Sequence, residues 1–146
     1  MKKILMIGAG AMGSAFSVPC VDNNNEVTLI GTFLENELIS KIKSNKNFHP
    51  SLNINLSSKI NIQNFDNLIN ITKKGIDIIV VAVSSVGIDW AGDEISKFYK
   101  SQTPIILLTK GLSINNDQLI TLSEKLELKL IVKAIEKAGL TNRKEK

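Results

Sequence analysis

The sequence is poor in the residues that build disulfide scaffolds, metal centres and membrane spans. Its 146 residues include one cysteine, Cys20, and one histidine, His49, so neither an internal disulfide nor a Cys/His metal cluster can form. We expect Cys20 to pack in the core and His49, beside Pro50, to lie in a loop. The longest apolar run, residues 76–83, is too short for a bilayer span, which needs about 20 residues. The sequence thus predicts no transmembrane helix, no metal site and a cytoplasmic location.

Aromatic residues are also scarce, at 5% of the chain, which leaves few platforms for stacking nucleic-acid bases. The net charge of +4 comes from scattered lysines, and the one dense basic cluster, residues 143–146, is equally explained as a solvated chain end. We therefore expect no nucleic-acid partner. The remaining composition, 43% hydrophobic and 22% charged, is that of a soluble globular protein, and the length suits one ordinary domain.

Short apolar runs without polar alternation alternate along the chain with segments of helical periodicity. Such runs are typical of strands buried on both faces of a parallel sheet. Strands are predicted over residues 3–7, 26–30, 59–62, 76–83 and 104–108, and helices over residues 11–21, 34–42, 65–75 and 86–99. The alternation predicts an α/β fold, a doubly wound parallel sheet of Rossmann type in a single three-layer domain.

Two parts of this pattern are less regular. Pro19 falls inside the first predicted helix, where its ring clashes with the preceding turn, so we expect the helix to bend or end early there. After residues 115–117, Leu119, Leu122 and Leu126 indicate a helix. We expect a last strand over residues 128–132 and a short helix over residues 134–138.

Three glycines, Gly8, Gly10 and Gly13, follow the first predicted strand in the stretch MIGAGAMGSA. In a dinucleotide site the first glycine permits a tight turn, the second lets the backbone approach the pyrophosphate, and the third lets helix and strand pack closely. The pyrophosphate then lies at the N-terminus of the helix, where free N–H groups favour an anion. The position between a buried strand and a helix favours cofactor binding over a turn that needs glycine for its backbone alone.

The tip of the second predicted strand leaves the choice between NAD and NADP open. An acidic residue about 20 positions after the glycines would bind the ribose 2′-hydroxyl of NAD. The tip here reads Ile30-Gly31-Thr32-Phe33, and the nearest acid, Glu35, falls at the start of the next predicted helix. Thr32 suits the ribose, a 2′-phosphate or the N-cap of that helix.

Ligands in doubly wound sheets gather outside the carboxyl ends of the strands, where Ser84, Ser85 and Lys110 also follow predicted strands. Either serine also suits the N-cap of the next helix. Lys110, followed by Gly111, would face the nicotinamide region and polarise a carbonyl or hold a phosphate. A solvated surface lysine is the alternative reading of Lys110.

These motifs together resemble a known family. The stretches IGAGAMGSAF, EVTLIGT, VVAVSS and TKGL occur in the order and spacing of the N-terminal domain of NAD(P)-dependent glycerol-3-phosphate dehydrogenase. The intervening NFHPSLNINL is similar to the segment that precedes the third strand of that family. The glycine motif is shared by many dehydrogenases, whereas TKGL after VVAVSS is considerably more specific.

The resemblance implies NAD or NADP as cofactor and a reversible hydride transfer that interconverts glycerol 3-phosphate and dihydroxyacetone phosphate, within glycerophospholipid metabolism. Lys110 matches the active-site lysine of this domain. The residues implied to touch the cofactor are Gly8, Gly10, Ala11, Met12 and Gly13 at the pyrophosphate, Thr32 and Phe33 near the adenosine ribose, and Val83, Ser84 and Ser85 towards the nicotinamide.

The resemblance covers residues 3–126, so we expect a dinucleotide-binding domain over residues 1–126 and a divergent segment over residues 127–146. The family's second, helical domain supplies its general acid/base lysine and its phosphate-binding groups, and these 146 residues contain no counterpart of it. We expect a truncated dehydrogenase that binds cofactor but is not active alone, with a homodimer or a partner chain left open. The alternatives are a free-standing regulatory module, or the first domain of a ketopantoate reductase or 3-hydroxyacid dehydrogenase.

Overall fold

The computed structural model describes residues 1–139, which form two compact units. The first unit consists of residues 1–83 and 100–109, and the second, within the described residues, consists of residues 84–99 and 110–139. No helix within residues 1–139 is both long enough and apolar enough to cross a membrane. The predicted basic cluster at residues 143–146 lies outside the described residues.

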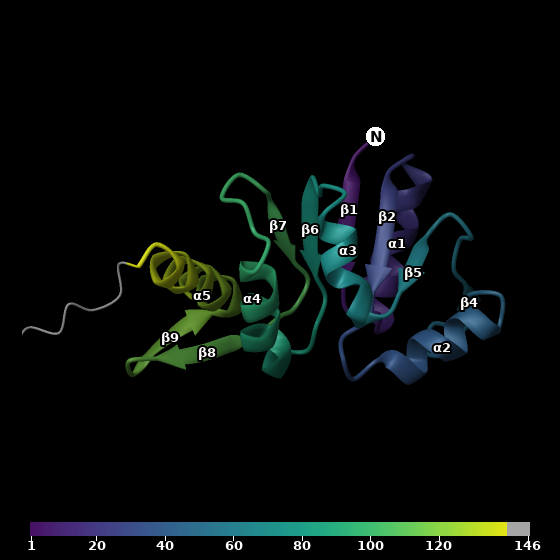
Figure 1. The fold of residues 1–146 in the computed structure, drawn as a ribbon. Coiled ribbons are helices and arrows are strands. Elements are labelled where there is room, and N and C mark those ends of the chain that lie inside the picture. The colour runs from purple at the N-terminus through teal and green to yellow at the C-terminus, as the bar shows by residue number, and fades with distance from the viewer. Residues whose placement is uncertain (140–146) are drawn as a thin grey trace, which may run out of the picture. The chain divides into compact units, whose positions relative to one another are not determined.

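A parallel sheet of five strands forms the centre of the first unit (Figure 1). Its order is β5-β2-β1-β6-β7, and every neighbouring pair is parallel. Counted along the chain, this is the 3-2-1-4-5 order of a dinucleotide-binding sheet, so the predicted α/β, doubly wound fold is confirmed. The strands are β1 (Lys3–Ile7), β2 (Glu26–Ile30), β5 (Asn61–Gln63), β6 (Ile78–Val81) and β7 (Ile105–Leu107).

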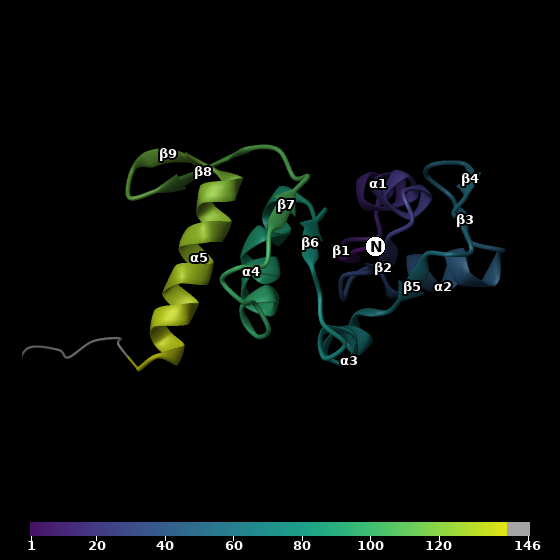
Figure 2. The same ribbon diagram turned by 90° about the horizontal axis from the view of Figure 1, so that it is seen from above.

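Helices cover both faces of this sheet. Helix α1 (Ala11–Asp22) lies on one face and α3 (Leu68–Thr72) on the other, as Figure 2 shows from above. The first unit also contains α2 (Asn36–Ser44), the 3-10 turn η1 (Phe65–Asn67), and the two-residue strands β3 (Phe48–His49) and β4 (Ile54–Asn55), which pair antiparallel. The β3–β4 hairpin is absent from the sequence-based prediction because neither strand is long enough to show a hydrophobic period.

The strand register brings the carboxyl ends of three strands to one edge. Ile7 of β1 pairs with Ile30 of β2 on one side and with Val81 of β6 on the other. Beyond the strands, the Gly8 N–H donates to the Ile30 carbonyl at 2.9 Å, and the Ala82 N–H donates to the Ile7 carbonyl at 2.8 Å. The turn after β1 is thereby fixed at the point where the strand order reverses, which is where doubly wound sheets bind ligands.

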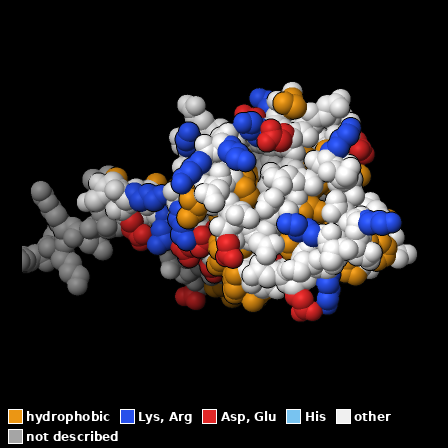
Figure 3. Space-filling model, turned by 45° about the vertical axis from the view of Figure 1, so that its right-hand side comes forward, with side chains coloured by type: hydrophobic (Ala, Val, Ile, Leu, Met, Phe, Trp, Pro, Cys, Tyr) orange, Lys and Arg blue, Asp and Glu red, His pale blue; other side chains and the backbone are white. Residues whose placement is uncertain are grey.

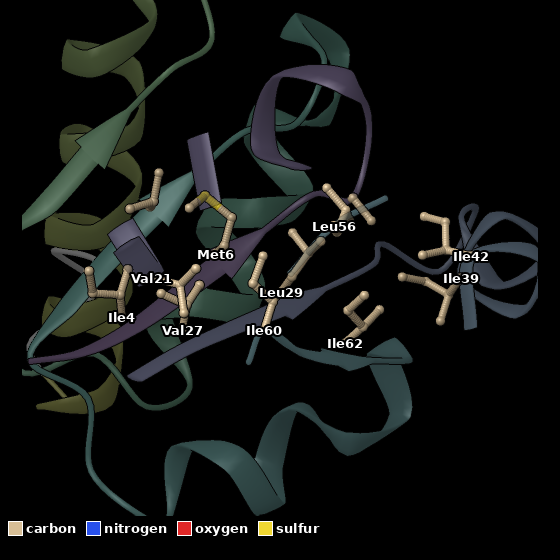
Figure 4. Close-up of a cluster of buried hydrophobic side chains, with 12 residues drawn as sticks. Ile4, Met6, Val21, Val27, Leu29, Ile39, Ile42, Leu56, Ile60 and Ile62 are labelled. Atoms are coloured by element: carbon tan, nitrogen blue, oxygen red, sulfur yellow. The ribbon is translucent and has the colours of Figure 1, made fainter. Parts of the chain in front are cut away.

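Figure 4 shows the buried apolar cluster that holds this sheet against its helices and loops. Full burial of one aliphatic side chain of this size contributes about 1.5–3 kcal/mol. Cys20 packs against the cluster as predicted, and burial raises the pKa of its thiol. The labelled cluster residues are Ile4, Met6, Val21, Val27, Leu29, Ile39, Ile42, Leu56, Ile60 and Ile62.

Over the right-hand part of the face in Figure 3, Lys and Arg side chains stand apart from one another, and several of them lie beside Asp or Glu side chains.

The second unit contains η2 (Ser85–Gly87), α4 (Ile88–Ser96), a hairpin of β8 (Leu112–Asn115) and β9 (Gln118–Thr121), and α5 (Leu122–Lys137). Helices α4 and α5 pack together, with ion pairs from Lys125 to Asp89 at 2.7 Å and from Lys129 to Asp93 at 3.0 Å. An added Cβ at Gly92 would approach Lys129 Cγ to 2.7 Å, so the small residue permits the close contact between these helices.

Two predictions for this unit are wrong. Leu119 lies in β9 rather than in a helix, because Asn116 and Asp117 both adopt positive φ (47° and 63°) and form the two-residue turn of a hairpin. The strand predicted over residues 128–132 is part of α5. That helix begins after Thr121, whose hydroxyl accepts from the Glu124 N–H while the Glu124 carboxylate accepts from the Thr121 N–H, a complete capping box.

Of the two alternatives for Pro19, a bend or an early end of the helix, the early end is wrong, since α1 continues to Asp22. The asparagines that follow satisfy the carbonyls of the last turn. Asn23 donates to the Pro19 carbonyl through its N–H at 3.2 Å and its side chain at 2.8 Å, and the Asn25 side chain donates to the Cys20 carbonyl at 3.0 Å. These caps hold the helix beyond the proline.

The first testable consequence concerns Pro19. Replacing it with Ala supplies an N–H for the carbonyl of the preceding turn, while losing the restriction that proline places on the unfolded chain. We expect Pro19→Ala to raise the free energy of unfolding in urea by about 1 kcal/mol. An unchanged or lower free energy of unfolding would show that the helix accommodates Pro19 at no cost.

Candidate functional site

The turn between β1 and α1 depends on glycine at two positions. Gly8 has φ +108°, and a Cβ there would lie 2.6 Å from the Ala82 carbonyl oxygen. Gly13 is buried, and a Cβ there would overlap the Gly8 carbonyl oxygen and lie 3.0 Å from Ala82 Cβ. The first glycine therefore permits the tight turn and the third permits the close packing of α1, as the motif predicts.

Gly10 differs from the other two because its surroundings are open. Its backbone is extended, with φ −64° and ψ −179°, and the only atom within 4 Å of an added Cβ is Glu35 Oε1 at 3.6 Å. Any residue can adopt this conformation, so the fold itself does not require glycine here. The glycine therefore leaves the space beside the turn open to a bound group.

The N-terminus of α1 presents unpaired donors beside this space. The first intrahelical bond runs from the Ser14 N–H to the Gly10 carbonyl at 3.0 Å, so the N–H groups of Ala11, Met12 and Gly13 precede it. The first turn of α1 has no acidic residue to compete for them. Ala11 and Met12 are exposed, so an anion can reach these donors, and the helix dipole favours it.

Ala9, inside the turn, is held by three side chains from different segments. Its N–H donates to Glu35 Oε2 at 3.1 Å, while its carbonyl accepts from Ser14 Oγ at 2.9 Å and lies 3.0 Å from His49 Nε2. His49 is completely buried in β3, so the prediction that it lies in a loop is wrong. The β3–β4 hairpin folds the segment after α2 back against the turn, a contact that the spacing of residues along the chain does not reveal.

Glu35 supplies the carboxylate that the tip of β2 lacks in the sequence. Its Oε2 accepts from the Thr32 N–H at 2.7 Å as well as from Ala9, because the Thr32 carbonyl accepts from the Glu35 N–H at 3.0 Å and closes a tight turn. Glu35, rather than Thr32, stands at the N-cap of α2, so the capping alternative for Thr32 is wrong. Thr32 is half-buried and Phe33 is exposed beside this carboxylate.

The remaining predicted residues divide between the two units. Val83, in the first unit, is buried, and its carbonyl accepts from the Thr109 hydroxyl at 2.6 Å. Ser84 and Ser85 belong to the second unit and are exposed; Ser84 stands at the N-cap of η2, but its side chain makes no capping bond. Lys110 also belongs to the second unit and is exposed. The first unit thus brings together the glycine turn and Thr32, whereas the roles of Ser84, Ser85 and Lys110 stay predictions.

Comparison with known families matches residues 3–138 to the model described as NAD-dependent glycerol-3-phosphate dehydrogenase N-terminus. The chain is 32% identical over 122 residues to the NADP(+)-dependent glycerol-3-phosphate dehydrogenase of Archaeoglobus fulgidus, covering 83% of this chain and 35% of that protein. It is 33% identical over 131 residues to glycerol-3-phosphate dehydrogenase [NAD(P)+] of Bacillus velezensis, covering 89% of this chain and 36% of that protein.

Among solved structures, the chain is similar to glycerol-3-phosphate dehydrogenase from Coxiella burnetii, with a TM-score of 0.70 and 18% sequence identity. The match covers 88% of this chain and 38% of that one. At this identity the likeness supports the α/β fold alone. The chain spans about a third of the length of the curated relatives it matches.

The contrast between Gly10 and Gly13 gives a matched pair of variants. Gly10→Ala has room in the folded chain, so we expect an unchanged melting temperature with NADH affinity weaker by roughly tenfold, because the methyl group enters the space beside the turn. Gly13→Ala forces the methyl group against the Gly8 carbonyl, and we expect a loss of about 2–3 kcal/mol in the free energy of unfolding. Thermal unfolding and NADH fluorescence titration measure the two effects. Equal NADH affinity for Gly10→Ala and the natural chain would contradict this account of the site.

Proposed function

Because this chain belongs to the NAD-dependent glycerol-3-phosphate dehydrogenase family, as its N-terminal NAD(P)-binding domain, we propose that it serves an enzyme interconverting glycerol 3-phosphate and dihydroxyacetone phosphate. The observation that best supports the proposal is the glycine turn between β1 and α1, at the edge where the strand order reverses. A bound nicotinamide would supply the hydride chemistry, and the residues of this chain would bind and orient the cofactor.

The fit of a dinucleotide rests on the space and the donors at the turn. The N–H groups of Ala11, Met12 and Gly13 bind the pyrophosphate, and Gly10 leaves room for the backbone to approach it. Thr32, Phe33 and the Glu35 carboxylate, at the tip of β2, contact the adenosine ribose. In this proposal Val83, Ser84 and Ser85 line the path towards the nicotinamide.

Lys110 is proposed to act on the substrate. A lysine ammonium holds a phosphate as a point charge or stabilises negative charge that develops on a carbonyl oxygen. Lys110 is exposed, and no ion pair occupies its ammonium among the described residues, so the cation is available to such a ligand. Hydride transfer also needs a water-excluded cleft and a positioned acid for the oxygen. We expect the 146-residue chain to bind the cofactor without oxidising glycerol 3-phosphate by itself.

The proposal is tested by titrating the purified chain with NADH and NADPH and following the fluorescence of the reduced nicotinamide. We expect saturable binding of at least one cofactor, and no NADH formation when NAD and glycerol 3-phosphate are added together. Failure to bind either cofactor would overturn the assignment of the glycine turn. Steady NADH formation would overturn the expectation that this chain alone is inactive.

Glu35 generates a prediction about cofactor preference. A carboxylate at the tip of β2 accepts a hydrogen bond from the 2′-hydroxyl of NAD and repels the 2′-phosphate of NADP. Glu35→Gln keeps an oxygen for the N–H groups of Ala9 and Thr32 but removes the charge. We expect the ratio of NADPH to NADH affinity to rise by roughly tenfold.

Glu37→Gln is the matched control for this charge change. Glu37 lies in the first turn of α2, the helix that follows the N-cap residue Glu35, and it is exposed and pairs with Lys41 at 2.7 Å. The control should leave the ratio of NADPH to NADH affinity unchanged. If both variants change that ratio equally, or if neither does, Glu35 is not next to the ribose.

A further inference from the structure

His49 approaches the proposed cofactor turn from outside the β1-α1-β2 segment. Ser14 belongs to α1 and Glu35 follows β2, whereas His49 comes from β3, 40 residues after the Ala9 carbonyl that it contacts. Its ring is completely buried and lies 3.0 Å from that carbonyl through Nε2. Burying a polar ring is costly unless its nitrogens are bonded, and both nitrogens of His49 have partners.

The partners of the two ring nitrogens define the tautomer. The Leu52 N–H donates to His49 Nδ1 at 3.3 Å, and a backbone N–H can only donate, so Nδ1 carries no proton. The proton of the neutral ring is therefore on Nε2, directed at the Ala9 carbonyl, which can only accept. The Leu52 N–H fixes the ring through Nδ1, and the ring in turn holds the Ala9 carbonyl through Nε2.

Holding the Ala9 carbonyl also sets the direction of a donor on the turn. The Ala9 carbonyl and the Gly10 N–H belong to one planar peptide unit and point in opposite directions. Ser14 Oγ and His49 Nε2 both hold the carbonyl on the buried side. The Gly10 N–H is thereby directed away from them, and Gly10 lies where an added Cβ meets only Glu35.

We propose that His49 is a positioning residue of the cofactor site: its Nε2–H fixes the Ala9–Gly10 peptide plane and so preorients the Gly10 N–H for the cofactor pyrophosphate. The identity of the ligand rests on the proposed function, whereas the role of His49 in holding the turn rests on the contacts of the chain itself. The β3–β4 hairpin, which carries His49, is thus part of the binding site without touching the cofactor. Preorientation lowers the cost of ordering the turn when the cofactor binds.

Two substitutions test the contributions of the two ring nitrogens separately. The side-chain amide of His49→Gln reaches the position of Nε2 and can donate to Ala9, whereas that of His49→Asn reaches only the position of Nδ1, facing Leu52. We expect His49→Asn to weaken NADH binding by about fivefold, the effect of one lost hydrogen bond to the Ala9 carbonyl. Because the turn then opens more often, the Ala9 N–H, which bonds Glu35 Oε2, should exchange faster by a similar factor. His49→Gln should stay within about twofold of the natural chain in both measurements.

Leu68→Ala is the control for a general loss of stability. Leu68 is buried in α3, on the face of the sheet opposite α1, and lies outside the buried cluster that contains Ala9, so its truncation should lower the melting temperature without changing NADH affinity. The proposal is overturned if His49→Asn binds NADH as tightly as His49→Gln does. It is equally overturned if Leu68→Ala weakens binding as much as His49→Asn.

A further test uses the natural chain, so its result does not depend on whether a variant folds. His49 is the only histidine, so ¹⁵N-labelled histidine gives the imidazole signals of this ring alone. We expect the Nε2-protonated tautomer, with a shift of the Nε2 signal when NADH is added. An Nδ1-protonated tautomer would overturn the proposal. If the natural chain bound neither cofactor but His49→Asn still sped Ala9 exchange, the proposed function would fail while the role of His49 in holding the turn would stand.

Discussion

The close approach of three backbone segments at Gly8, Gly13 and Ala82 is the constraint on which the rest of the site depends. A Cβ at either glycine would collide with a carbonyl oxygen, so α1 can lie against the carboxyl ends of β1 and β6 only because both positions lack one. This contact places the first turn of α1, with its unpaired N–H groups, at the edge where the strand order reverses. Anion binding follows from the packing, since the same contact sets both the position and the direction of the helix.

Polar side chains hold the backbone of the turn that the glycines permit. Glu35, Ser14 and His49 bind the two backbone groups of Ala9, and each comes from a different segment of the first unit. A turn made of small residues has many accessible conformations, and the conformational entropy lost when it becomes ordered opposes ligand binding. Side-chain bonds to the peptide groups restrict these conformations before the ligand arrives. The apolar cluster beneath the turn, including Leu29 and Met6, gives these bonds a rigid base.

The parts of the fold that local pattern determines were predictable. Strands β1 and β2 and helix α1 have buried apolar runs, glycines and asparagines in sequence, and the structure places them where the sequence predicts. Glu35 and His49 were not recognised as parts of the turn because their contacts depend on how residues 31–35 and 45–56 fold back in space. The β8–β9 hairpin was missed because Asn116 and Asp117 suit a helix cap as well as a hairpin turn, and only their positive φ decides between these.

The central claim is that a nicotinamide dinucleotide binds through the backbone donors of the turn between β1 and α1. The most direct measurement is the shift of backbone amide resonances in ¹H–¹⁵N NMR spectra as NADH is added to the uniformly labelled chain. The account predicts that the largest shifts occur at the amides of Gly10, Ala11, Met12 and Gly13 and saturate together with the fluorescence of NADH. Saturable binding that leaves these four amides unshifted and moves resonances elsewhere would contradict it.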